Sequence, residues 1–300
     1  MLHEKDSIDI LTLTRGTDRC DLVPALGGSI AAWSANGHDM LRPASAASIA
    51  AQDPFGMGGF PLVPYSNRIG NGSFDWEGHR HSLTLNFHPE PHAIHGVGFE
   101  RPWHVRASTA DSATLTLQHR PGASWPFAFE AEQRITLAER TLTIEMSALN
   151  LEARPVPLGF GFHPYFLRDG AWLKFRAESV WLLGDDGLPS LRVKPFGKFD
   201  YANSMSVSRG DIDHCFTGWD GRAEISWPGR HLGLGIEASN SLCCTVVCIR
   251  SDLDGFCFEP VPHLNDALNR HERAHAMPVI APGGRFDATI RLTALERAPA

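Results

Sequence analysis

The chain has 300 residues, of which 43% are hydrophobic and 20% are charged, with 28 glycines and 21 prolines. This composition suits a globular protein with a large core and many turns, and it excludes disordered and collagen-like classes. Because 34 acidic residues outnumber 27 Lys and Arg residues and the net charge is -7, the chain lacks the cationic surface that binds a phosphate backbone, and no nucleic-acid partner is expected.

The predicted elements are strands, because short runs alternate apolar and polar residues with a period of two. In chain order these runs are Ile8–Thr14, Ala113–Gln118, Phe129–Leu137, Thr141–Ser147, His231–Glu237, Cys244–Ile249 and Phe286–Thr293. Residues 263–276 are compatible with a short helix, but they are too few to cover a parallel sheet. We therefore predict an all-β chain of two stacked antiparallel sheets, larger than an immunoglobulin-type sandwich.

No boundary divides the chain, because it contains neither a low-complexity linker nor an internal repeat. Residues 1–300 are therefore expected to form a single domain. No stretch has about 18 uninterrupted apolar residues, and residues 1–6 show no basic segment followed by an apolar one. These features predict a cytoplasmic protein with no membrane partner.

Six cysteines are sparse for this length, and the adjacent pair Cys243 and Cys244 does not suit a disulfide framework. Cys244 and Cys248, four residues apart, suggest a zinc site. The apolar, β-forming run that contains them favours another interpretation, in which the thiols pack as small buried side chains.

Arg68 is the one charged residue in the segment 60–74, which is rich in proline, glycine and apolar residues. Such a segment forms a rigid, irregular backbone, so Arg68 is expected to be at least partly buried. Its guanidinium can either clamp loop carbonyls or present its planar set of donors to the hydroxyl oxygens of a ligand.

A histidine-rich stretch contains His79, His81, His88, His92 and His95. A cupin-like metal site would begin with two histidines on one strand face, as at His79 and His81, and His95 could complete it. The carboxylate that should closely follow His81 is missing. His95 precedes Gly96, which allows close backbone approach, so His95 suits a ligand pocket.

His163 lies among aromatic residues, and the proline that follows it favours an extended backbone. Burial lowers the pKa of an imidazole and a neighbouring carboxylate raises it, so His163 could serve as a general acid near neutral pH. The alternative is a buried histidine that is hydrogen-bonded to a backbone carbonyl.

Glu259 supplies the complementary group at the end of an apolar run, where burying a carboxylate is costly without a partner. It is the predicted base, and it could also form an ion pair with Arg68 or another arginine. Asp213 is a further candidate acceptor at the start of a strand.

Five short motifs occur in the order found in one enzyme family: Asn67-Arg68-Ile69, His95-Gly96, Gly161-Phe-His-Pro-Tyr-Phe166, Asp213-His-Cys-Phe216 and Phe258-Glu259-Pro260. Through them, residues from about 15 to about 295 resemble the aldose 1-epimerase (galactose mutarotase-like) family. The resemblance implies a β-supersandwich with few short helices and a sugar cleft across one sheet. It also implies a small-molecule aldose substrate and neither metal nor redox cofactor.

The resemblance also implies roles for individual residues. Glu259 would take the proton of the C1 hydroxyl while His163 protonates the ring oxygen; the ring then opens, rotation about C1–C2 follows, and reversal closes the opposite anomer. His95 would hold or polarise the ring-oxygen side. The implied substrate-binding residues are Arg68, Asn67 and Asp213.

Two positions depart from family members that act on galactose. Those members tend to carry an asparagine where this chain has Phe162, and a glutamine where it has Val261. Because valine can neither donate nor accept a hydrogen bond, a divergent branch is indicated. The alternatives are a non-catalytic carbohydrate-binding β-sandwich and a cupin-like metalloenzyme, and the oligomeric state is expected to be a monomer or a homodimer.

Overall fold

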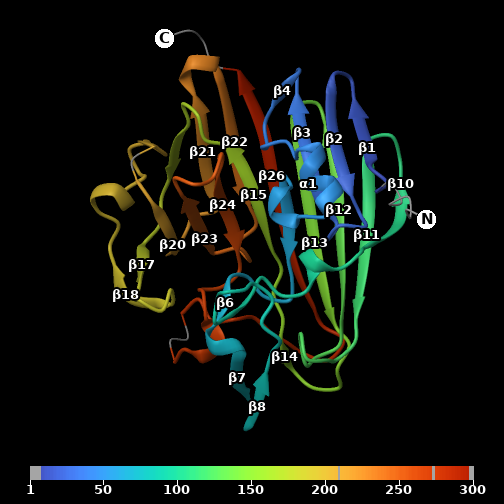
Figure 1. Cartoon of the computed structure of the whole chain (residues 1–300), viewed down its shortest axis with the longest axis vertical. Coiled ribbons are helices and arrows are strands. Elements are labelled where there is room, and N and C mark those ends of the chain that lie inside the picture. The colour runs from blue at the N-terminus through green and yellow to red at the C-terminus, as the bar shows by residue number, and fades with distance from the viewer. Residues whose placement is uncertain (1–7, 209, 272–273, 297–300) are drawn as a thin grey trace, which may run out of the picture.

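The computed structural model describes residues 8–208, 210–271 and 274–296, and residues 1–6, on which the predicted cytoplasmic location partly depends, lie outside this part. Two large sheets form the body of the molecule, and every pair of named strands in them is antiparallel (Figure 1). The predicted all-β, antiparallel architecture is therefore confirmed. In the described residues no helix is long and apolar enough to cross a membrane.

The first sheet has eleven strands, and its central strands come from distant parts of the sequence. Their order is β1 (Leu11–Arg15), β2 (Asp18–Val23), β3 (Ser29–Ala35), β5 (Gly59–Leu62), β15 (Gly161–Leu167), β24 (Gly255–Val261), β23 (Cys244–Ile249), β20 (Ile212–Thr217), β17 (Ser179–Leu183) and β18 (Pro189–Val193), with β4 (His38–Asp39) paired to β3. Strands from the middle and the end of the chain thus lie side by side.

The second sheet has nine strands. Their order is β10 (His104–Ser108), β11 (Ser112–His119), β12 (Phe129–Ala138), β13 (Thr141–Asn150), β26 (Arg285–Glu296), β22 (Leu232–Ala238), β21 (Arg222–Trp227), β16 (Trp172–Phe175) and β19 (Met205–Ser206). Each of the seven predicted strands overlaps an observed one, and the first prediction, Ile8–Thr14, begins three residues before β1.

The remaining elements are short. Small ladders join β6 (Arg68–Ile69) to β9 (Ala93–Ile94), β7 (Ser73–Trp76) to β8 (His79–Ser82), and β14 (Val156–Pro157) to β25 (Val279–Ile280). The helices are α1 (Ala46–Ala51) and the 3-10 turns η1 (Pro54–Gly56), η2 (Gly70–Gly72), η3 (Gly98–Glu100), η4 (Gly197–Phe199), η5 (Pro228–Arg230) and η6 (Ala267–Asn269). Figure 1 shows β6, β7 and β8 together at one end of the sheets.

The helix predicted over residues 263–276 is wrong for the described part of that segment, which contains only η6. Asp266 adopts a left-handed backbone conformation (φ 56°). Its carboxylate accepts a hydrogen bond from the N–H of Gly70, and its own N–H donates to the carbonyl of Arg68. Bonds to a neighbouring loop thus replace those of a helix. Residues 272–273 lie outside the described part.

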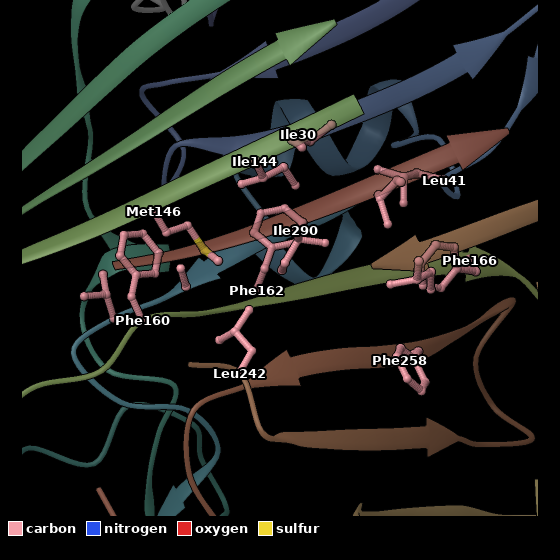
Figure 2. Packing of buried hydrophobic residues seen from close by; sticks show 14 of the residues in the cluster. Ile30, Leu41, Ile144, Met146, Phe160, Phe162, Phe166, Leu242, Phe258 and Ile290 are labelled. Carbon is pink, nitrogen blue, oxygen red and sulfur yellow. The ribbon is translucent and has the colours of Figure 1, made fainter. Parts of the chain in front are cut away.

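Because side chains alternate along a strand, one face of the first sheet packs in the core and the other face carries the predicted site residues. On β15 and β24, Phe162, Phe166 and Phe258 belong to the main apolar core that both sheets share. Figure 2 shows Phe162 beside Ile290 of the second sheet. His163 and Glu259 stand at the intervening positions, so they lie on the opposite face.

Candidate active site

A cavity of about 270 Å³ lies on that opposite face of the first sheet. Its volume is near the lower end of the roughly 300–1,000 Å³ found for small-molecule sites. Six of the residues that line it are the six predicted site residues: Asn67, Arg68, His95, His163, Asp213 and Glu259. The fold therefore brings together groups that are widely separated in the sequence.

His163 and Glu259 form a buried pair at the base of this cavity. His163 Nε2 lies 3.3 Å from Glu259 Oε1, and the two side chains are only 7% and 2% exposed. The ring of Phe60 stacks on the imidazole at 4.5 Å between centroids. This apolar cover removes water from both groups.

Burial lowers the pKa of His163 to about 3, and burial raises the pKa of Glu259 well above its usual value. Both directions favour the neutral forms, because a charged group is poorly solvated here. The imidazole and the carboxyl group thus face each other as an acid and a base in direct contact.

Two polar atoms of this pair have no hydrogen-bond partner in the described part of the protein: His163 Nδ1 and Glu259 Oε2. Most buried polar atoms in folded proteins are hydrogen-bonded, because an unsatisfied buried group is costly. Unpaired atoms on both members, next to a cavity, suit a ligand that supplies hydroxyl groups.

His95 is held by the backbone of the loop that contains Asn67. The Asn67 N–H donates to His95 Nδ1 at 3.1 Å, and the His95 N–H donates to the Asn67 carbonyl at 3.0 Å. Burial is the main reason that the pKa of His95 is lowered well below its usual value. A neutral ring that accepts at Nδ1 must carry its proton on Nε2, so His95 offers an N–H donor.

Gly96 makes this loop geometry possible. Its φ is +75°, and a Cβ there would lie 2.3 Å from the Val63 carbonyl oxygen. Only glycine tolerates such contact in this conformation. The sequence prediction that Gly96 allows close backbone approach beside His95 is thus confirmed.

Arg68 is 12% exposed, which confirms the prediction that it is at least partly buried. Its Nε and Nη2 donate to the two carboxylate oxygens of Glu90 at 3.1 and 2.9 Å, and Nη1 lies 3.5 Å from Asp213. The predicted alternative of an ion pair between Arg68 and Glu259 is wrong, because Glu259 contacts His163 instead. The hydrogen bond from Arg68 lowers the pKa of Glu90.

Glu90 and Arg42 were not predicted, and no local pattern marks either of them. Arg42 lies behind the cavity wall, with its guanidinium 4.1 Å from the centre of the Tyr165 ring. It also donates to the carbonyls of Phe55 and Met57. Since Tyr165 and Phe55 both line the cavity, Arg42 fixes the shape of that wall.

Several side chains could ligate a metal ion. The cupin-like grouping is wrong, because His79 and His81 lie on β8, where His81 stacks on Phe74, and only His95 of the three lines the cavity. Ligand atoms do approach one another in two groups of the described residues, His163, Cys257 and Glu259 in the cavity, and Cys243, Cys244 and His275 outside it.

The pairing of Cys244 with Cys248 as zinc ligands does not occur among the described residues. Cys244 is buried in an apolar cluster and Cys248 packs against the same cluster. Cys244 thus fits the prediction of a small buried side chain, whereas Cys248 is only partly buried and lines the cavity.

Comparison with known proteins shows which family this chain belongs to. The sequence profile of the aldose 1-epimerase family matches residues 9–293. YphB, an uncharacterised protein of Escherichia coli (strain K12), is 28% identical over 283 residues, which cover 91% of this chain and 94% of YphB.

Solved structures share the fold. The crystal structure of a candidate aldose 1-epimerase from Escherichia coli K12 has a TM-score of 0.88 and 26% identity, covering 96% of this chain and 99% of that one. Galactose 1-epimerase from Lactobacillus acidophilus NCFM has a TM-score of 0.77 and 18% identity, covering 96% of this chain and 95% of its own.

Proposed function

Because the chain belongs to the aldose 1-epimerase family, we propose that it is a mutarotase, which interconverts the α and β anomers of an aldose by acid–base opening and closure of the sugar ring. One observation supports this most strongly. The His163–Glu259 pair is a buried acid and base in contact, and both residues line a cavity for a small molecule.

In the proposed reaction, Glu259 acts as a carboxylate and His163 in its protonated form, two states that a proton transfer across their 3.3 Å contact would interconvert with the neutral ones. Glu259 then takes the proton of the C1 hydroxyl while His163 donates to the ring oxygen, and the bond between C1 and that oxygen breaks. Rotation about C1–C2 and the reverse transfers close the other anomer. Each positioned acid or base typically contributes about 10²- to 10⁴-fold.

The other residues would bind and orient the sugar. The Nε2–H of His95 would donate to an oxygen on the ring-oxygen side. Asp213 would accept from a hydroxyl near C2, while Arg68 and Asn67 would hold further hydroxyls. Arg68 is pre-oriented for this by Glu90, so less ordering is needed when the sugar binds.

The cavity also bears on the choice of sugar. Phe162 packs in the core between the sheets and Val261 packs in a second apolar cluster. Neither lines the cavity. These two positions therefore offer no hydrogen bond to galactose, which supports assignment to a branch that acts on another aldose.

The test is magnetisation-transfer NMR, which measures anomeric exchange directly, on a panel of neutral, deoxy, acidic and phosphorylated aldoses. Exchange of one class that depends on the enzyme and is absent with Glu259→Gln would support the mutarotase. Sugar binding with no exchange by the wild type would favour a non-catalytic carbohydrate-binding protein instead. A cytoplasmic location and a monomeric or homodimeric state stay predictions.

A further inference from the structure

A second cluster of metal-ligating side chains lies outside the cavity, where β23 begins. Cys243 immediately precedes this strand and Cys244 is its first residue. His275 comes from the segment that follows β24, and the fold places it beside them. Cys243 Sγ lies 3.8 Å from Cys244 Sγ and 3.7 Å from His275 Nδ1, and all three ligand atoms lie within 4.8 Å of one another.

These distances suit one metal ion. Tetrahedral zinc binds sulfur at about 2.3 Å and imidazole nitrogen at about 2.05 Å, which places two sulfur ligands about 3.8 Å apart and a sulfur and a nitrogen about 3.6 Å apart. The two measured distances from Cys243 Sγ match both edges of such a tetrahedron. The third pair of ligand atoms, from Cys244 and His275, lies within 4.8 Å.

We propose that Cys243, Cys244 and His275 form a binding site for zinc or a similar thiophilic divalent cation, with a fourth tetrahedral position for water. Two thiolates and an imidazole are the ligand types that zinc prefers. The site is distinct from the cavity, because none of the three residues lines it. It is also independent of the proposed sugar chemistry.

The surroundings suit such a site. Cys244 is fully buried, whereas Cys243 and His275 are partly exposed and give an ion access from solvent.

A bound ion would connect two parts of the chain. The Leu264 N–H donates to the His275 carbonyl at 3.0 Å, and the Asp266 N–H donates to the Arg68 carbonyl at 2.9 Å. The segment that carries His275 therefore also supports the loop of Arg68. An ion held by His275 and Cys243 would fix this segment to the start of β23 and stabilise the folded state.

The experiment is titration of the full-length, reduced protein with Co²⁺ and then Zn²⁺. Thiolate-to-cobalt charge-transfer absorption reports sulfur ligation, and a chromophoric chelator in competition gives the zinc affinity. We expect sulfur-ligated cobalt that zinc displaces, and a thermal midpoint that rises when zinc is added to the wild type. Absence of thiolate charge transfer in the wild type would overturn the site.

Two variants make the test specific. Cys243→Ser and His275→Asn should each weaken zinc binding by at least about 100-fold, because loss of an outer-shell partner alone costs about 10- to 100-fold. Asparagine tolerates the left-handed backbone of His275 (φ 63°). Unchanged zinc affinity in both variants would refute the assignment of the ligands.

Matched controls separate ligation from general damage. His231→Asn alters an exposed histidine with a similar left-handed backbone (φ 55°), and Cys248→Ser removes another thiol from β23. Both should keep wild-type zinc affinity. Equal losses in these controls would contradict the proposed site, and thermal unfolding without metal verifies that each variant is folded.

Discussion

The two sides of the cavity both pair an acid with a nitrogen base, yet they hold their charges differently. On the inner side, His163 and Glu259 are almost fully buried, and burial drives both toward neutrality. On the outer side, Arg68 keeps its charge beside Glu90 and Asp213, whose side chains are 28% and 33% exposed. The buried carboxyl of Glu259 faces an imidazole that burial keeps neutral, whereas the more exposed carboxylates of Glu90 and Asp213 face a guanidinium that stays charged.

This difference suggests separate functions, catalysis and substrate binding, for the two sides of the cavity. A proton can move within the neutral pair without creating net charge in an apolar surrounding. Arg68 cannot exchange protons near neutral pH, but together with Glu90 and Asp213 it presents fixed donors and acceptors to a polar ligand. Chemistry should thus depend on the inner pair and binding on the outer group, and changes to each side test that division.

The largest effect is expected for Glu259→Gln, which keeps the shape of the side chain but removes the proton acceptor. We expect kcat/KM for anomeric exchange to fall by about 10³- to 10⁴-fold, within the range for a lost acid or base. NMR exchange rates measure the fall, with Glu145→Gln, exposed on β13, as the matched control. A wild-type rate would remove Glu259 from the mechanism.

A smaller loss, about 10²- to 10³-fold in kcat/KM, is expected for His163→Asn. The reason is that His95 lies nearby, with its ring centroid 5.1 Å from that of His163, and its N–H can partly replace the lost donor. His104→Asn, exposed on β10, serves as the control in the same exchange assay. If this variant keeps full activity, the acid is another group.

Glu90→Gln should act on binding, because it weakens the two-point hold on Arg68 while leaving the inner pair intact. We expect KM to rise about tenfold, equivalent to about 1.4 kcal/mol, with little change in kcat. Steady-state kinetics separate the two constants. A loss of kcat as large as that of Glu259→Gln would contradict the proposal that the inner pair performs the chemistry and the outer group only binds the substrate.

The smallest effect concerns stability in acid. In the folded protein the pKa of His163 is lowered from 6.5 to about 3, so between these values the unfolded chain binds a proton that the folded chain does not. Stability from this group is present above pH 6.5 and is lost as pH falls. The loss should be about 1 kcal/mol between pH about 6.5 and about 5.5.

Urea unfolding of wild type and His163→Asn over that pH range measures this contribution. The contributions of most other ionisable groups to the free energy of unfolding are the same in both proteins, so they cancel when the two free energies are subtracted. The variant should show the shallower dependence on pH. Parallel curves for the two proteins would mean that His163 is not neutral in the folded state.

Alternation predicted seven of the strands, because it reports which face of a sheet a residue occupies. The six cavity residues were predicted from short motifs and a family resemblance, and β15 and β24, which carry His163 and Glu259, were not among the seven predicted strands. Glu90 could not be predicted in the same way. Its contact with Arg68 depends on how two loops pack against each other, and the spacing of residues in the sequence does not reveal that packing.

The same limit explains the errors. Residues 263–276 have a helical composition, but the groups of Asp266 bond to the loop that contains Gly70. Likewise, Cys244 was considered with Cys248 on its own strand, whereas the side chains whose potential ligand atoms lie within 4.8 Å of it are Cys243 and His275. Contacts made across the fold decided both outcomes.

The alternation on β15 also limits how this enzyme family can diversify. Phe162 and Phe166 hold the two sheets together, and His163 between them cannot move without moving its neighbours. We therefore expect a change of substrate to arise in the connecting loops, such as the one that carries Glu90 and His95, rather than in these strands. The proposed acid–base pair would then stay in place while the binding residues around it change.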